Sequence, residues 1–148
     1  MVAYTIIHII FSKTRKMEAG IKLTLEKEVI NSMTAKSMGS GTLDVLATPA
    51  MIALIEETAW KSVANELEPG QGTVGISLNV EHLAPTPLGM NIRCEATLVG
   101  VDGRKLTFEV AAYDESGLIG KGTHERFIIN ESKFQAKANG KLEKTIIK

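Results

Sequence analysis

Residues 46–82 read LATPAMIALIEETAWKSVANELEPGQGTVGISLNVEH, and this stretch decides the fold. Thr48-Pro49 predicts the start of a helix, with Thr48 as the N-cap and the proline at the first helical position, where its missing N–H is tolerated. We expect the helix to run to about Leu67. Residues 50–55 are apolar almost all round, which indicates a helix enclosed by a sheet rather than one lying on a surface.

Strands are predicted on both sides of this helix. Apolar and polar residues alternate over 21–29, which is typical of a strand with one wet face, and 31–43 is expected to be a loop or lid. After the helix come strand-like runs at about 73–83, 88–99, 104–114 and 118–129. The connections between these strands are short and contain turn-forming residues, and consecutive strands joined in this way pair antiparallel. We therefore expect an α+β domain in which a curved antiparallel sheet wraps one long central helix, in β-α-β-β-β-β order.

Composition limits the classes of partner. The chain has 148 residues, and 17 Lys and Arg balance 17 Asp and Glu, so the formal net charge is zero. No overall field steers such a protein to nucleic acid or to an anionic membrane, and we expect neither as a partner. Cys94 is the only cysteine and the three histidines are scattered, so we expect no metal site and no cofactor. The cysteine count fits the reducing cytoplasm.

One domain is expected at residues 17–130, flanked by two different ends. In residues 1–16 the positive charge follows a short apolar run, which fits neither a signal peptide nor a membrane-spanning helix. The two interpretations of this segment are an upstream mis-start before Met17 and an extra edge strand. Residues 131–148 carry five lysines against two glutamates and are expected to be a frayed helix or a solvated extension.

His82 points most directly to a functional site. Period-two alternation from Val74 to His82 puts the even-numbered residues on the core side of their strand and Gly75 on the other side. His82 therefore points inward, where an imidazole without hydrogen-bond partners costs roughly 1–3 kcal/mol. It is either a hydrogen-bonded structural histidine or part of an acid–base site.

Glu56 offers a partner for that imidazole. Its neighbours three and four residues away along the helix are apolar, whereas Glu57 and Lys61 form a solvated i,i+4 pair. A carboxylate near an imidazole is a common acid–base arrangement. The alternative is a structural ion pair between Glu56 and Arg126.

Three segments carry a resemblance to a known family. They are LATPAMIALIEETAW at 46–60, LEPGQGTVGISLNVEHLAPTPLGM at 67–90 and GKGTHERFIIN at 120–130. Over about residues 22–137 the chain is similar to the fluoroacetyl-CoA thioesterase family and its relatives. The resemblance implies the hotdog fold, an acyl-CoA thioesterase activity, and a homodimer with a site at each subunit boundary.

The resemblance also assigns roles to individual residues. Thr48, Glu56 and His82 fall on the family's catalytic Thr, Glu and His. Gly75 falls on a glycine that lines the site, and Arg126 falls on the arginine of the family's THER motif. Three spaced matches are far more specific than any one of them alone.

Thioester hydrolysis gives each matched residue a chemical task. The amides of Ala50 and Met51 at the helix N-terminus can hold the developing oxyanion, helped by the helix dipole. Glu56 either attacks the carbonyl or activates water, and the sequence leaves both routes open. His82 can shuttle the proton to the departing thiolate. Thr48 is expected to orient the thioester, although Thr before Pro is also an ordinary N-cap.

The substrate expectation departs from the family name. Residues 12–59 contain no aromatic residue, whereas the fluoroacetyl-specific member has phenylalanines in a lid before its catalytic Thr. A short or medium acyl-CoA is therefore the expected substrate. Two alternatives on the same fold are a non-catalytic protein that binds acyl-CoA or a small acid, and a hydratase.

Three further expectations concern the THER region and the tail. Arg126 and the lysine-rich tail are expected to recognise the phosphates of CoA. His124 is expected to pack at a dimer seam. Gly120 and Gly122 are expected to permit close backbone approach rather than to cradle a phosphate, because no helix follows them directly.

Overall fold

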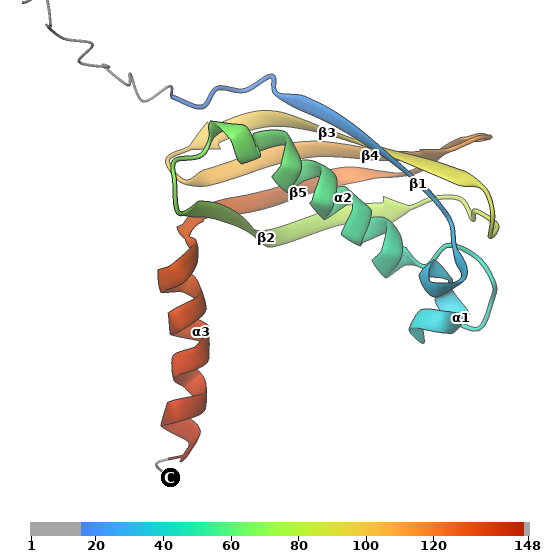
Figure 1. The fold of residues 1–148 in the computed structure, drawn as a ribbon. Coiled ribbons are helices and arrows are strands. Elements are labelled where there is room, and N and C mark those ends of the chain that lie inside the picture. Colours follow the sequence, from blue (N-terminus) through green and yellow to red (C-terminus); the bar gives the residue numbers. More distant parts are fainter. Residues whose placement is uncertain (1–15, 147–148) are drawn as a thin grey trace, which may run out of the picture.

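The computed structural model describes residues 16–146 and contains one five-stranded antiparallel sheet with a long helix against it (Figure 1). In chain order the elements are β1 (Lys22–Glu28), η1 (Asn31–Met33), α1 (Ala35–Met38), α2 (Thr48–Val63), η2 (Ala64–Glu66), β2 (Gln71–His82), β3 (Asn91–Asp102), β4 (Lys105–Asp114), β5 (Gly117–Asn130) and α3 (Glu131–Ile146). The sheet order is β1-β3-β4-β5-β2, so β1 and β2 are its edges. This arrangement confirms the α+β fold that the sequence predicts.

The hydrophobic core lies between α2 and the sheet. Buried apolar residues on α2 recur at helical spacing, at Met51, Leu54, Ile55, Ala59 and Val63. They belong to one cluster with buried residues of β3 and β4, among them Leu98 and Phe108. Burying each large apolar side chain of this kind contributes about 1.5–3 kcal/mol to stability. The apolar run at the start of α2 is therefore enclosed by the sheet, as its sequence indicates.

Glu57 lies on the outer stripe of α2. Its carboxylate is 3.2 Å from Lys27 Nζ and 3.7 Å from Lys61 Nζ, and all three side chains are partly exposed. Exposed pairs of this kind contribute at most about 1 kcal/mol. Glu57 is thus a surface carboxylate one position away from Glu56, which makes it a matched control for experiments on the site.

A β-bulge in β2 corrects the predicted faces of that strand. Gly75 pairs with Arg126 of β5, but the register shifts between Gly75 and Ser77, and Leu78 pairs with His124. An extra residue in one strand reverses which positions face inward on the two sides of the bulge. The predicted placement of Gly75 away from the core is therefore wrong: it shares the inner face with Arg126, whereas Ile76 is 50% exposed.

The segment between β1 and α2 contains more regular structure than the expected loop. Thr34 caps the short helix α1, its Oγ1 accepting a hydrogen bond from the Ser37 amide at 3.2 Å. Gly39 ends that helix in the left-handed conformation with φ of 74°. Bridges from Thr34 to Leu46 and from Val45 to Pro87 tie the segment to the start of α2 and to the loop after β2.

The C-terminal tail forms the helix α3. It begins where the Glu131 amide donates a hydrogen bond to the Gly70 carbonyl, and it points away from the sheet in Figure 1. The helical alternative for the tail is thereby confirmed for residues 131–146. No helix within residues 16–146 is long and apolar enough to cross a membrane. Residues 1–15, on which the two interpretations of the leader depend, lie outside the described residues.

Candidate active site

Thr48 and His82 meet at the start of α2. Thr48 Oγ1 and His82 Nδ1 share a hydrogen bond of 2.8 Å between residues 34 positions apart. Ala47 is the N-cap, and no side chain makes the capping hydrogen bond. The N-cap interpretation of Thr48 is therefore wrong, because its hydroxyl contacts the imidazole at the end of β2 instead of a first-turn amide.

The second nitrogen of His82 has no partner. Among residues 16–146, His82 Nε2 is the one buried side-chain nitrogen or oxygen without a hydrogen bond. Burial lowers the pKa of His82 below its ordinary 6.5, and a backbone interaction with Ala84 opposes that shift. A neutral imidazole has one donor and one acceptor nitrogen, and the Thr48 hydroxyl can pair with Nδ1 in either role, so Nε2 takes whichever role Nδ1 leaves.

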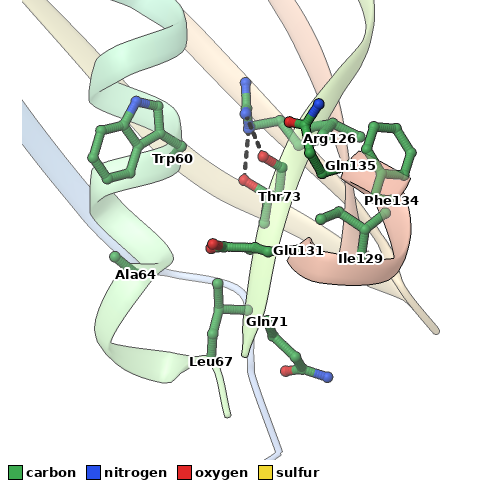
Figure 2. A pocket seen from close by; sticks show the side chains of 12 residues that line it. Trp60, Ala64, Leu67, Gln71, Thr73, Arg126, Ile129, Glu131, Phe134 and Gln135 are labelled. Carbon is green, nitrogen blue, oxygen red and sulfur yellow. Dashed lines mark hydrogen bonds between the residues drawn. The ribbon is translucent and has the colours of Figure 1, made fainter. Parts of the chain in front are cut away.

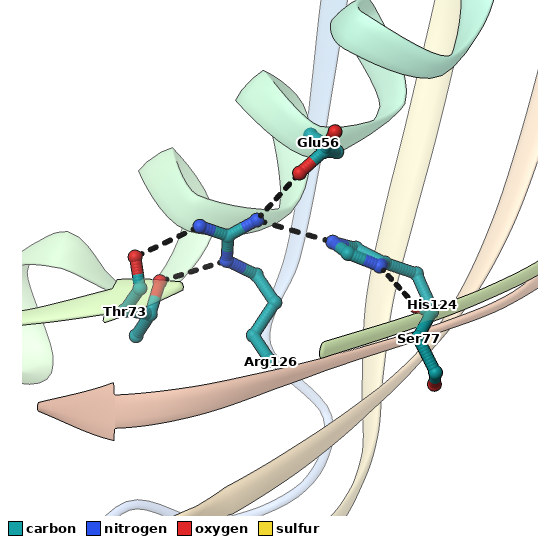
Figure 3. A network of polar contacts seen from close by, with 5 residues as sticks. All are labelled: Glu56, Thr73, Ser77, His124 and Arg126. Atoms are coloured by element: carbon teal, nitrogen blue, oxygen red, sulfur yellow. Dashed lines mark hydrogen bonds and ion pairs between the residues drawn. The ribbon is translucent and has the colours of Figure 1, made fainter. Parts of the chain in front are cut away.

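Glu56 lies further along α2 and is held by Arg126 (Figure 3). Arg126 NH1 is 3.3 Å from Glu56 Oε2. The arginine side chain is only 6% exposed, whereas that of Glu56 is 39% exposed. The Glu56 side chain is therefore partly open to solvent, and its contact with the buried Arg126 guanidinium restrains its position.

Arg126 is itself tied down on its other donors. Its Nε donates to Thr73 Oγ1 and its NH2 donates to the Thr73 carbonyl, both at 2.8 Å. Burial lowers the pKa of Arg126, and the adjacent Glu56 carboxylate counteracts this. A buried guanidinium whose nitrogens already donate to Thr73, Glu56 and His124 does not present two free N–H groups to a phosphate, so the expected contact with CoA phosphates does not fit this geometry.

His124 is part of the same network. Its Nε2 is 3.2 Å from Arg126 NH1, which can only donate, so Nδ1 carries the proton and donates to the Ser77 carbonyl at 2.8 Å. Burial lowers the pKa of His124, which favours this neutral form. His124 is fully buried within a single chain, with its ring stacked on Phe108, so its burial requires no dimer seam. Sequence reasoning missed this role, although the spacing of His124 and Arg126 on one strand face was a usable signal.

Gly75 leaves room for the carboxylate. A Cβ at this position would lie 2.8 Å from Glu56 Oε2 and 3.2 Å from His124 Cε1. Any side chain there would displace one of these groups. Gly75 thus lines the site as expected, but it does so because the bulge in β2 turns it inward.

The two groups of residues do not touch within one chain. Thr48 and Glu56 are eight residues apart on α2, which separates them by about 12 Å along the helix axis. His82 contacts Thr48, whereas Glu56 contacts Arg126. One chain therefore presents two half-sites, defined here as the Thr48–His82 half-site and the Glu56–Arg126 half-site, rather than one assembled triad.

The start of α2 retains one of the two expected oxyanion donors. The Met51 amide donates to the Ala47 carbonyl at 3.0 Å, and the Met51 side chain is fully buried, so the expectation of a free Met51 amide is wrong. The Ala50 amide belongs to the first turn, whose amides have no intrahelical acceptor. Ala50 thus lies beside Thr48 with a donor directed out of the helix N-terminus.

Other reactive groups lie outside this arrangement. Burial raises the pKa of the Cys94 thiol to about 12, which makes it a poor nucleophile. Within the described residues, no group of three or more His, Cys, Asp or Glu side chains is arranged to hold a metal ion. The candidate site offers a carboxylate, an imidazole, a hydroxyl and a helix N-terminus, which are groups suited to acyl transfer.

Comparison with known proteins places this geometry in a family. Residues 29–132 match the family model described as fluoroacetyl-CoA-specific thioesterase. The fluoroacetyl-CoA thioesterase of Streptantibioticus cattleyicolor is 42% identical over 98 residues, which is 66% of this chain and 70% of that protein.

Solved structures agree with the sequence match. The fluoroacetyl-CoA thioesterase FlK has a TM-score of 0.81 at 35% identity, covering 84% of this chain and 97% of that one. A hypothetical protein of Thermus thermophilus, described as a thioesterase superfamily member, has a TM-score of 0.83 at 29% identity and covers 90% and 99% of the two chains. The class defined by this fold and site is the hotdog thioesterase, a thioester hydrolase. Within that class, the chain belongs to the fluoroacetyl-CoA-specific thioesterase family.

Proposed function

We propose that this protein hydrolyses short or medium acyl-CoA thioesters in the cytoplasm, at sites completed by a second copy of the chain. The observation that carries this proposal is the pair of half-sites on α2. His82 Nε2 has no hydrogen-bond partner, which supports a role in proton transfer, and Glu56 is held by Arg126 with 39% of its side chain exposed. Neither feature is required of a protein that only binds an acid.

A twofold dimer along β2 would join the half-sites. The edge strand β2 exposes 50% of Ile76 and 42% of Leu78, and an open apolar edge favours pairing with another strand. Antiparallel pairing in full overlap puts Gln71 of one copy opposite His82 of the other. Because Thr48 meets the end of β2, α2 runs antiparallel to it, and the Thr48–His82 half-site of one copy then approaches the Glu56–Arg126 half-site of the other.

Each residue of the two half-sites has its own task in the proposed thioester hydrolysis. The Ala50 amide and the positive end of the helix dipole stabilise the oxyanion on the thioester carbonyl. Glu56 either attacks the carbonyl carbon or removes a proton from the attacking water, and both routes end with the free acid. His82, neutral at rest, takes up the proton that the attacking water loses, directly or through Glu56, and passes it to the departing CoA thiolate, while Thr48 orients the imidazole ring. Arg126 and Gly75 set the position of Glu56.

The test is a thiol-release assay with a panel of acyl-CoA substrates. Glu56→Gln and His82→Ala should each lower kcat by about 10² or more, because each removes an acid–base or nucleophilic group. Glu57→Gln changes the neighbouring surface carboxylate and should leave kcat almost unchanged.

The assay also separates the alternatives. Binding of acyl-CoA without release of thiol from any substrate would favour the non-catalytic binding protein. Conversion of an enoyl-CoA without thiol release would favour the hydratase. Near-native turnover in both the Glu56→Gln and His82→Ala proteins would remove these residues from the reaction.

A further inference from the structure

A groove opens beside the Glu56–Arg126 half-site, between α2, the start of β2 and the start of α3. It has a volume of about 640 Å³, within the range of small-molecule sites. Its apolar wall is formed by Trp60, Leu67, Val74, Ile129 and Phe134. Figure 2 shows the α2 residues on one side, Phe134 and Ile129 on the other, and Arg126 with Thr73 between them.

Arg126 connects the groove with the carboxylate of Glu56. Arg126 and Thr73 line the groove and hydrogen-bond each other, and the same guanidinium contacts Glu56 at 3.3 Å. A thioester whose carbonyl carbon is next to Glu56 therefore has an apolar space on the far side of Arg126. CoA has to leave in another direction, because its phosphates find no free cation among the residues that line the groove.

The charges of the groove select against anionic ligands. Arg126 is the one cation in its lining, and its donors are engaged by Thr73, Glu56 and His124. Glu131 lies over Gly72, with its Oε1 2.6 Å from the position that a Cβ of this glycine would take, and it points across the groove in Figure 2. A terminal carboxylate on the ligand would face this acid without a free cation to balance it.

From this lining we infer that the groove holds the acyl chain of the substrate and selects an uncharged, medium-length acyl group over acetyl and over dicarboxylic acyl groups. This inference rests on the proposed thioesterase function and adds the class of acyl group. The specificity determinants are then Trp60, Phe134 and Glu131, and not residues 12–47, which contain no aromatic residue.

The test compares kcat/KM for acetyl-, butyryl-, hexanoyl-, octanoyl- and succinyl-CoA on the full chain. The value should rise by roughly fourfold per added methylene group, as expected for moving a methylene out of water. Succinyl-CoA should be hydrolysed at least tenfold more slowly than butyryl-CoA. Phe134→Ala and Trp60→Ala should flatten the chain-length dependence, lowering kcat/KM for octanoyl-CoA by a much larger factor than kcat/KM for acetyl-CoA. Leu142→Ala, an exposed position further along α3, is the control.

A charge variant and a binding measurement complete the test. Glu131→Gln should narrow the gap between succinyl- and butyryl-CoA. Titration of the slow Glu56→Gln protein with octanoyl- and acetyl-CoA by calorimetry should give tighter binding of the octanoyl compound, independently of turnover.

Each contrary outcome has its own meaning. A flat chain-length dependence in the native protein, with thiol released from every substrate, would overturn the acyl-chain inference and leave the thioesterase proposal intact. No thiol release from any substrate would overturn the proposed function, and equal calorimetric affinities would then overturn the groove as well. If Phe134→Ala instead weakened the dimer and left the chain-length dependence unchanged, the groove would be filled by the second subunit.

Discussion

The two half-sites on α2 hold their functional side chains in different ways. His82 has a single side-chain partner, the Thr48 hydroxyl, and a buried nitrogen without any. Glu56 is held by a guanidinium that is fixed in turn by Thr73 and His124. The first half-site thus leaves one imidazole nitrogen without a partner, and the second keeps a carboxylate in place. This difference agrees with the tasks proposed for the two residues, which are proton transfer for His82 and attack or water activation for Glu56.

The largest effect is expected from a substitution of Gly75 in the Glu56–Arg126 half-site. Gly75→Ala should lower kcat by about ten- to hundredfold, because the new Cβ lies 2.8 Å from Glu56 Oε2 and displaces the carboxylate by a few tenths of an ångström or more. Steady-state kinetics with thermal unfolding measure both effects. Gly100→Ala is the control, since its Cβ would meet only Thr107 at 3.6 Å. Equal kinetics for the two variants would show that Glu56 tolerates displacement.

Removing the hydroxyl partner of His82 tests the Thr48–His82 half-site. Thr48→Val keeps the shape of the side chain and should lower kcat by about tenfold, because the imidazole of His82 loses the hydrogen bond that orients it. Thr48→Ser should restore most of the activity, since its hydroxyl can reach His82 Nδ1. A valine variant with native kcat would reduce the 2.8 Å contact to a packing interaction.

The smallest expected effect is in the dependence of kcat/KM on pH, where protonation of His82 sets the pH at which activity falls on the acidic side. His82 must be neutral to accept a proton, and burial lowers its pKa below 6.5. The value of kcat/KM should therefore stay constant as the pH falls to 6.5 and decline only below it, as the imidazole takes up a proton. A limb centred above 6.5 in a kcat/KM profile would indicate that another group controls the rate.

Much of the fold was predictable from local patterns. The apolar run at the start of α2 and the alternation in the strands depend on periods that any buried helix or half-wet strand imposes. Gly120 and Gly122 also behave as expected, since a Cβ on Gly122 would clash with the backbone of Asn79 and one on Gly120 would lie 2.7 Å from Met51 Sδ. The helix, the strands and the two glycines depend on neighbouring elements that the sequence pattern predicts.

The details of the site were less predictable because they depend on contacts between distant residues. The bulge after Gly75 reverses the inner face of β2 without changing the alternation of the sequence. Thr48 makes no cap because His82, 34 residues away, takes its hydroxyl. The burial of Arg126 by Thr73 and His124 likewise follows from the pairing of β2 with β5, which the sequence indicates only in outline.

The central claim is that the two half-sites work across a subunit boundary, and mixing inactive subunits tests it most directly. Glu56→Gln and His82→Ala chains would be unfolded together, refolded and compared with each variant refolded alone. A hybrid dimer contains one site with both native residues if Glu56 of one copy acts with His82 of the other. The mixture should then recover about a quarter of native activity, because about half of the dimers are hybrids with one of two sites intact. Activity no greater than that of the separate variants, in a mixture shown to contain hybrid dimers, would contradict the account.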